Sequence, residues 1–370
     1  MTVSWLKDAY HLGAPISHFG QPDGVFRYGP TMRALQFTEY GPPEVVQVTE
    51  IDAPHAGPGE IRIAVRASGV AAGDVRIRSG EMRAVVPVTF PYRPGFDAAG
   101  VVDEVGDAVT GVGVGDEVFG MARSATRGAN ADFVVLAAWA PKPASWSWEE
   151  AGGAAGAVET GTRVLDRLAV SAGQTVLIQG AAGGTGTVAV QLAVARGATV
   201  IGTASSQNHD FLRSLGAEPT TYGVGLAERV RALAPGGVDA VFDCAGGSLP
   251  ELIAIAGDPA RVVTIADLTA AAHGVHMSHG APAGETGAAV GAGADPLALH
   301  GLAIAVTLAA EGRLRVPVAA AFPLAEAAAV ADAVQRVMRD PSFRERATTL
   351  AQQYRASDPV ARILELIDQT

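Results

Sequence analysis

The feature that most constrains the fold of this chain is a run of small residues at 180–186, which reads Gly-Ala-Ala-Gly-Gly-Thr-Gly. The apolar run 176–178 precedes it and predicts a strand covered on both faces. Val188 and Leu192 follow it on one face of a predicted helix, and a second strand is predicted at 199–201. Strand, tight turn, helix and strand in this order are typical of a parallel sheet with helices packed on it.

The small residues of this loop indicate a dinucleotide site. They let the chain turn sharply, bring its backbone against a diphosphate and pack the helix on the strand. The start of the helix then presents free N–H groups and a partial positive charge to the phosphates. The alternative is a merely tight strand-to-helix turn, but the strands on both sides favour the dinucleotide site. The predicted cofactor-binding residues of the loop are Ala182, Gly183, Gly184, Thr185 and Gly186.

The end of the next strand bears on the choice between NAD and NADP. NAD sites usually place an acidic residue there to hold the ribose 2′-hydroxyl. Here no carboxylate is found before Asp210, and Arg213 lies one turn into the following helix. Hydroxyl and amide groups can donate hydrogen bonds to a 2′-phosphate, so NADPH is the predicted cofactor. The alternative is that the serines only cap the next helix. The residues concerned are Thr203, Ser205, Ser206 and Asn208.

The chain divides into an α/β protein with two kinds of domain. Short strands without long helices, among them 61–66 and 99–106, run from Met32 to about residue 140 and predict a barrel-like antiparallel domain. From about residue 150, strands and helices alternate, which predicts a doubly wound domain. Residues 269–300 are rich in Gly, Ala and His and predict a loop or a poorly defined segment. The predicted division is an N-terminal extension at 1–31, a catalytic domain at 32–155 and 304–370, and a dinucleotide-binding domain at 156–303.

Composition excludes several classes of partner and site. The chain has 38 acidic and 27 basic residues and a net charge of −11, which argues against nucleic acid and anionic membranes as partners. Its one cysteine, Cys244, rules out an intrachain disulfide and a zinc site built from several cysteines. There is no charged-then-apolar leader and no apolar span of about twenty residues. We therefore expect a cytoplasmic protein.

Segments 95–102, 114–120 and 180–186 occur in this order and carry a resemblance to a known family. Together they resemble the zinc-independent quinone oxidoreductase (zeta-crystallin-like) branch of the medium-chain dehydrogenase/reductase superfamily. The similarity covers about residues 32–324. It implies a GroES-like β-barrel catalytic domain, a Rossmann domain and an active site in the cleft between them. It also implies a homodimer and hydride transfer from NADPH to a quinone or an α,β-unsaturated carbonyl.

The resemblance further implies individual site residues. Thr162 would lie near the nicotinamide, Ala245, Gly246 and Ile265 would offer backbone contacts to the cofactor, and Tyr222 would approach the 2′-phosphate. Phe96 stands where zinc-dependent relatives have a ligating histidine, so no metal is expected. Three histidines at a spacing of three could bind a metal, but in a glycine-rich segment such a cluster is more often incidental. They are His273, His276 and His279.

The catalytic candidates follow from the charge that develops on the acceptor oxygen, which a hydrogen-bond donor can stabilise. Tyr92 and Arg127 are candidate donors, although Tyr92 could equally be a packing residue. Asp74 is a third candidate, and its carboxylate could instead hold the N–H groups of a turn. Ala71 stands where relatives have an asparagine that points toward the substrate. The alternative function is therefore a catalytically impaired NADPH-binding scaffold or partner protein. The C-terminal tail, atypical and helical in composition, carries Ala361, Leu364 and Ile367 on one predicted helical face.

Overall fold

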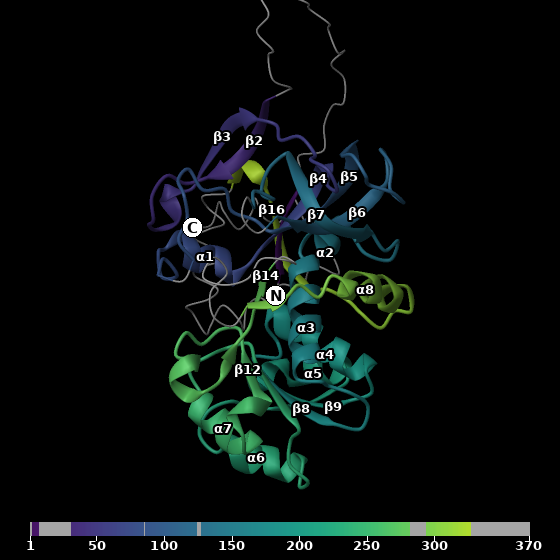
Figure 1. The fold of residues 1–370 in the computed structure, drawn as a ribbon. Helices are drawn as coiled ribbons and strands as arrows, with labels where there is room; N and C mark the ends of the chain where they lie inside the picture. Colours follow the sequence, from purple (N-terminus) through teal and green to yellow (C-terminus); the bar gives the residue numbers. More distant parts are fainter. Residues whose placement is uncertain (1, 7–30, 85, 124–126, 282–293, 327–370) are drawn as a thin grey trace, which may run out of the picture.

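The computed structural model describes residues 2–6, 31–84, 86–123, 127–281 and 294–326. Figure 1 shows a β-rich half, at the top of the view, and a half with a parallel sheet and helices below it. The helix α3 (Ala155–Arg167) runs between the two halves. The predicted α/β architecture, a barrel-like domain followed by a doubly wound domain, is confirmed.

The β-rich half is built on a six-stranded sheet with the order β16-β1-β4-β5-β6-β7. Strand β4 also pairs with β7, so four of the strands close into a ring that leaves no free edge between them. Alternate residues Ile61 and Ile63 of β4 are fully buried inside it, against Leu136 of β7. The strands are β1 Thr2–Leu6, β4 Ile61–Val70, β5 Asp97–Val105, β6 Glu117–Ala122, β7 Phe133–Pro141 and β16 Val318–Pro323.

Two further elements of this half bear on the cleft described below. The hairpin of β2 (Thr31–Gln36) and β3 (Gln47–Asp52) forms a separate two-stranded sheet. The helix α1 (Ala72–Arg78) directly follows β4. A cluster containing Leu35, Phe37 and Val75 packs the hairpin and α1 against each other.

The N-terminal extension differs from the sequence-based expectation, which left residues 1–31 outside the fold. Strand β1 pairs with β16 in parallel and with β4 in antiparallel orientation. A five-residue segment has too short a pattern to reveal a strand, and its partners lie far away in the chain. Residues 7–30 lie outside the described part.

The second half contains a parallel sheet with the strand order β10-β9-β8-β11-β12-β13. The chain order reverses between β8 and β11, and such a switch point places a crevice at the carboxyl ends of these strands. The strands are β8 Thr175–Gln179, β9 Thr199–Thr203, β10 Ala217–Thr220, β11 Ala240–Asp243, β12 Val262–Thr264 and β13 His276–Met277.

Helices cover both faces of this sheet, as the continuous apolar strand predicts. Val176 and Ile178 of β8 face a core that includes residues of α3 and α4, whereas Leu177 faces a core that includes residues of α6 and α7. The remaining α-helices are α2 Trp148–Gly152, α4 Gly184–Ala195, α5 His209–Ser214, α6 Leu226–Leu233, α7 Leu249–Ala256 and α8 His300–Ala310. The 3-10 helices are η1 Pro43–Val45, η2 Ser206–Asn208, η3 Pro259–Arg261, η4 Ala270–His273 and η6 Leu324–Glu326.

The prediction of a loop at 269–300 is wrong for the part that the structure describes. This segment contains η4, β13, β14 (His279–Ala281) and β15 (Ala294–Pro296). Asp295 accepts hydrogen bonds from Ser278 and from Nε2 of His276, at 2.5 and 2.9 Å. Long-range polar contacts rather than local hydrophobic periodicity fix these short strands. Residues 282–293 and the C-terminal tail at 327–370, with Ala361, Leu364 and Ile367, lie outside the described residues.

Candidate functional site

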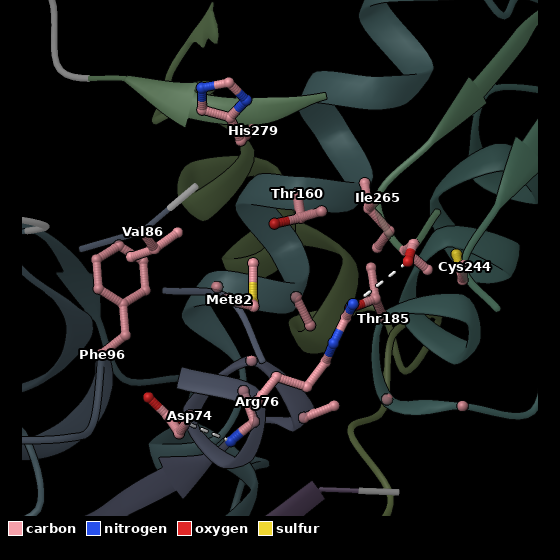
Figure 2. A pocket seen from close by; sticks show the side chains of 18 of the residues that line it. Asp74, Arg76, Met82, Val86, Phe96, Thr160, Thr185, Cys244, Ile265 and His279 are labelled. Carbon is pink, nitrogen blue, oxygen red and sulfur yellow. Dashed lines mark hydrogen bonds between the residues drawn. The ribbon is translucent and has the colours of Figure 1, made fainter. Parts of the chain in front are cut away.

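A cleft of about 2200 Å³ lies between the two halves and is lined by both. The parallel half contributes the loops after β8, β11 and β12, which meet at the switch point of the sheet. The β-rich half contributes α1 and the segment before β5. Figure 2 shows side chains of both halves pointing into this space. A cleft at a switch point between two domains is a common place for a ligand.

The glycine loop forms one end of the cleft, and all five of its predicted residues, 182–186, line it. Gly180 has φ of +72°, and a Cβ atom on Gly186 would lie 2.3 Å from the carbonyl oxygen of Gly180. Larger residues would therefore destroy the turn. The helix α4 begins at Gly184, and no side chain caps its N-terminus. Its first N–H groups face a cradle of small residues that fits a diphosphate.

Strand β9, the next strand of the parallel sheet along the chain, holds this turn in place through Thr203. Thr203 is fully buried, and its Oγ1 accepts a hydrogen bond from the N–H of Gly180 at 3.1 Å. Its predicted contact to a cofactor is therefore replaced by a role in positioning the loop. Ser205 and Asn208 line the cleft and are joined by a hydrogen bond of 3.1 Å, whereas Ser206 is exposed and is not among the lining residues.

Tyr222 lines the same end of the cleft, and it is exposed. Arg229 of α6 donates hydrogen bonds to the carbonyl oxygens of Thr221 and Val224, each at 2.8 Å, and so fixes the loop that carries Tyr222. Asp210 and Arg213 pair with each other at 2.7 Å and are not among the residues lining the cleft. This end therefore presents hydroxyl and amide groups.

Ala245, Gly246 and Ile265 also line the cleft, and a Cβ atom on Gly180 of the glycine loop would lie 3.1 Å from the Cβ of Ala245. Asp243 at the end of β11 accepts hydrogen bonds from the N–H groups of Ala245 and Gly246, at 3.0 and 2.9 Å. It also accepts one from the hydroxyl of Thr264, at 2.7 Å. A buried carboxylate thus holds the backbone that a cofactor would contact.

Thr162 is not brought into this cleft. It is buried against α8, where a Cβ atom on Gly301 would lie 2.4 Å from its hydroxyl. The residues of α3 that line the cleft are Gly156, Ala157, Glu159, Thr160 and Arg163. Thr160 is the hydroxyl that faces the cleft (Figure 2). The helical spacing of 156, 160 and 163 is the signal that could have identified this face from the sequence.

Tyr92 lines the cleft on the side of the β-rich half. Its ring packs against Phe37, with ring centroids 5.2 Å apart. Its hydroxyl is buried and has no hydrogen-bond partner among the residues that the structure describes. Burial raises the pKa of Tyr92 to about 12. The side chain therefore stays protonated and holds an unused hydrogen-bond donor at the cleft.

Arg127 and Asp74 are brought together, 3.4 Å apart, in the same wall. The carboxylate of Asp74 also accepts the N–H of Ala71 at 3.0 Å, so it holds the start of α1. The guanidinium of Arg127 lies over the ring of Phe96, 5.2 Å from its centroid. Asp74 therefore has the turn-holding role that the sequence left as an alternative, and it also anchors Arg127.

Two cleft residues were missed from the sequence. Arg76 of α1 pairs with Glu81 at 2.9 Å and reaches across the cleft, where its Nη1 lies 3.4 Å from the carbonyl oxygen of Ala266 (Figure 2). Asp97 begins β5 and accepts the N–H of Gly156 of α3 at 2.9 Å. Burial, reinforced by the negative charge of Asp74, raises the pKa of Asp97 to about 7. Asp97 lies inside the segment 95–102, but nothing in its neighbours along the chain reveals these contacts.

Across the described ranges, no three His, Cys, Asp or Glu side chains lie close enough together to hold an ion. His276 pairs with Asp295, and His273 and His279 line the cleft separately. Burial raises the pKa of the Cys244 thiol, which disfavours the thiolate that binds metals.

In the same described ranges, no helix combines the length and the apolar character needed to cross a bilayer.

Comparison with known proteins identifies the family. Residues 57–203 match the alcohol dehydrogenase GroES-like domain, and residues 184–281 match a family described as zinc-binding dehydrogenase. The chain is 32% identical over 198 residues to 2-methylene-furan-3-one reductase of Solanum lycopersicum, covering 50% of this chain and 51% of the relative. It is 36% identical over 180 residues to quinone oxidoreductase of Rattus norvegicus, covering 48% and 54%. The chain thus spans about half the length of these curated relatives.

The likeness to solved structures extends further along the chain. The quinone oxidoreductase from Coxiella burnetii has a TM-score of 0.67 and 27% identity, and the match covers 83% of this chain and 96% of that one. This family consists of nicotinamide-dependent dehydrogenases and reductases. The paired domains, the glycine loop and the cleft between the halves agree with these matches. The chain thus resembles two domain families of the alcohol dehydrogenase type over residues 57–281, and its similarity to quinone oxidoreductases supports the quinone oxidoreductase branch of the medium-chain dehydrogenase/reductase superfamily.

Proposed function

We propose that this protein is an NADPH-dependent reductase that transfers a hydride to a quinone or an α,β-unsaturated carbonyl. The observation that carries the proposal is that one cleft is lined by both the glycine loop and Tyr92, whose buried hydroxyl has no hydrogen-bond partner among the described residues. The printed names of the relatives, a quinone oxidoreductase and a methylene-furanone reductase, support this class of acceptor.

The two walls of the cleft have different roles in this reaction. A bound reduced nicotinamide cofactor supplies the hydride. The glycine loop and the backbone at Ala245 and Gly246 hold that cofactor, and they leave the β-rich wall to orient the acceptor. The Tyr92 hydroxyl donates a hydrogen bond to the acceptor oxygen as negative charge develops on it. Because its pKa is about 12, it stabilises that charge as a donor without releasing its proton.

NADPH is proposed over NADH because of the groups at the adenosine end of the cleft. Ser205, Asn208 and Tyr222 line this end, and no described Asp or Glu of the segment 203–209 opposes a phosphate. A carboxylate would repel the 2′-phosphate, whereas hydroxyl and amide groups can donate to it. Titration with each coenzyme tests the assignment, and we expect a lower Kd for NADPH. Equal Kd values for both coenzymes would refute it.

We also propose a homodimer, as the family resemblance implies, and a cytoplasmic location. Sedimentation equilibrium tests the dimer, and a monomer at micromolar concentration would contradict it. Cell fractionation tests the location.

The activity is tested by stopped-flow oxidation of NADPH against a panel of quinones and enones. We expect turnover with at least one acceptor class. Tight NADPH binding without oxidation by any acceptor would favour the alternative of a scaffold that has lost turnover. Ala71, whose methyl group lines the cleft, is the departure that motivates this alternative.

A further inference from the structure

The reduction proposed above needs a proton as well as a hydride, and Tyr92 is poorly suited to supply it. After hydride addition to the β-carbon of an enone, the carbon–carbon π electrons move to form an enolate, whose α-carbon then takes a proton. A group that gives up a proton at neutral pH needs a pKa near 7. With a pKa of about 12, Tyr92 holds its proton too strongly for this step.

A second acid lies in the same wall of the cleft. Asp97 lines the cleft at the start of β5, next to the lining residues Phe96 and Gly156. Its carboxyl fills space that two glycines leave open. A Cβ atom on Gly156 would lie 2.6 Å from Oδ1, and one on Gly69 would lie 3.4 Å from the Cβ of Asp97. The side chain is therefore fixed by packing from β4 and α3, with one oxygen bonded to the N–H of Gly156.

The two acids of this wall have different partners. Asp74 is paired with Arg127, whereas Asp97 has no cation within ion-pair distance among the described residues. The charged groups facing Asp97 are Asp74 from α1, Arg127 from the segment before β7, and Glu159 from α3. On the adjacent strands, Met121 of β6 pairs with Asp97, and Ser68 of β4 pairs with Ala98, the residue that follows Asp97. None of these side chains titrates near neutral pH. Two neighbouring carboxyls whose environments differ in this way are suited to different roles, and the one without a cationic partner is suited to donate a proton.

We propose that Asp97 is the proton donor of the reductase. This inference rests on the proposed function. The hydride adds to the β-carbon, and the α-carbon of the enolate takes the proton of the Asp97 carboxyl as its O–H bond breaks. For a quinone, the proton goes to the phenolate oxygen instead. Two electrons pass from the reduced nicotinamide to the acceptor, and water in the cleft returns a proton to the Asp97 carboxylate.

The test compares Asp97→Asn with the wild-type protein. The amide oxygen of asparagine can still accept the N–H of Gly156, so the local packing is retained while the proton is lost. We expect kcat at pH 7 to fall at least about a hundredfold, the contribution typical of general acids. We expect Kd for NADPH to stay within about twofold, because Asp97 is remote from the glycine loop in the chain and lies in the opposite wall. Asp107→Asn is the matched control, since Asp107 is exposed and is not among the residues that line the cleft, and it should leave kcat unchanged.

A pH profile separates donation from a merely structural role. Wild-type kcat should fall as the pH rises through about 7, where the donor loses its proton. Asp97→Asn should lose this limb together with the solvent deuterium isotope effect, and Asp97→Glu, which keeps a carboxyl, should retain the limb at a lower rate. If the asparagine variant does not fold, the wild type and the glutamate variant test the proposal. Both should show the fall of kcat through about pH 7 and the solvent isotope effect, and their absence in the active wild type would refute proton donation by Asp97. If the wild type is active and Asp97→Asn has the same kcat and pH profile, proton donation by Asp97 is refuted and the proposed function stands. A wild type that reduces no acceptor overturns the proposed function as well.

Discussion

The two walls of the cleft are built from different kinds of interaction. On the parallel wall, the glycine loop and the segment at Ala245 and Gly246, which Asp243 holds, offer backbone groups to a ligand. On the β-rich wall, they are side chains positioned by partners far away in the chain, such as Asp74 by Arg127 and Asp97 by Gly156. The parallel wall therefore suits an invariant cofactor, and the β-rich wall can change with the acceptor. Four substitutions test this division of roles.

The largest effect is expected from Gly184→Val at the first residue of α4. Two methyl groups at this position would block the approach of a diphosphate to the N–H groups of the helix. We expect Kd for NADPH to rise about a hundredfold or more, as measured by quenching of cofactor fluorescence. Gly236→Ala is the control, because nothing lies within 4 Å of a Cβ atom there. Unchanged affinity in the valine variant would contradict the loop assignment.

The next effect is expected from Tyr92→Phe, which removes one donor from the β-rich wall. We expect kcat to fall about a hundredfold, as for the loss of one donor to a developing oxyanion, with little change in Kd for NADPH. Steady-state kinetics with the best acceptor measures kcat, and coenzyme titration measures Kd for NADPH. Equal losses in kcat and coenzyme affinity would show that the two walls do not act separately, and no loss in either would make Tyr92 a packing residue.

Arg76→Ala tests an arginine that reaches from the β-rich wall to the parallel wall. Its guanidinium adds a positive charge to the cleft, part of which Glu81 neutralises at 2.9 Å. We therefore expect a modest rise in Kd for NADPH, about fivefold, or about 1 kcal/mol. Arg93→Ala is the matched control, because Arg93 lines the cleft and no described contact joins it to the opposite wall. The same rise in Kd for both variants would mean that any positive charge in the cleft favours NADPH, and that the contact of Arg76 with the parallel wall has no separate effect.

The smallest effect concerns stability and the protonation of Asp97. Its pKa in the folded protein, about 7, lies above its ordinary value of 3.8. The folded state therefore binds this proton more tightly than the unfolded state, and the group lowers stability as the pH rises from about 4 through 7. We expect the stability of Asp97→Asn relative to wild type to be greater at pH 8.5 than at pH 5, by on the order of 1 kcal/mol, because solvent in the cleft screens part of the effect. Chemical denaturation at both pH values measures the difference, which should be absent if Asp97 titrates normally.

The sequence predicted residues in both walls of the cleft, among them Asp74, Tyr92 and Arg127 of the β-rich wall. Residues 182–186 line the cleft as predicted, because a turn made of small residues has few possible conformations. Ser205, Asn208, Tyr222, Ala245, Gly246 and Ile265 line it too. Thr203, Ser206 and Thr162 do not, since the direction of one side chain depends on the packing of its whole element. Thr162, for example, faces α8, and Thr160 faces the cleft.

By itself, the sequence determined the two kinds of domain, the cofactor loop and the position of the chain within its family. These features depend on periodicity and on backbone geometry within short contiguous segments. Only the tertiary structure decided that β1 joins the sheet, that Arg76 reaches across the cleft and that Asp97 holds its proton near neutral pH. The hydrogen bonds that place Arg76 and Asp97 join residues 190 and 59 positions apart. Burial and electrostatic interaction depend on distance in space, and the folded chain alone sets that distance.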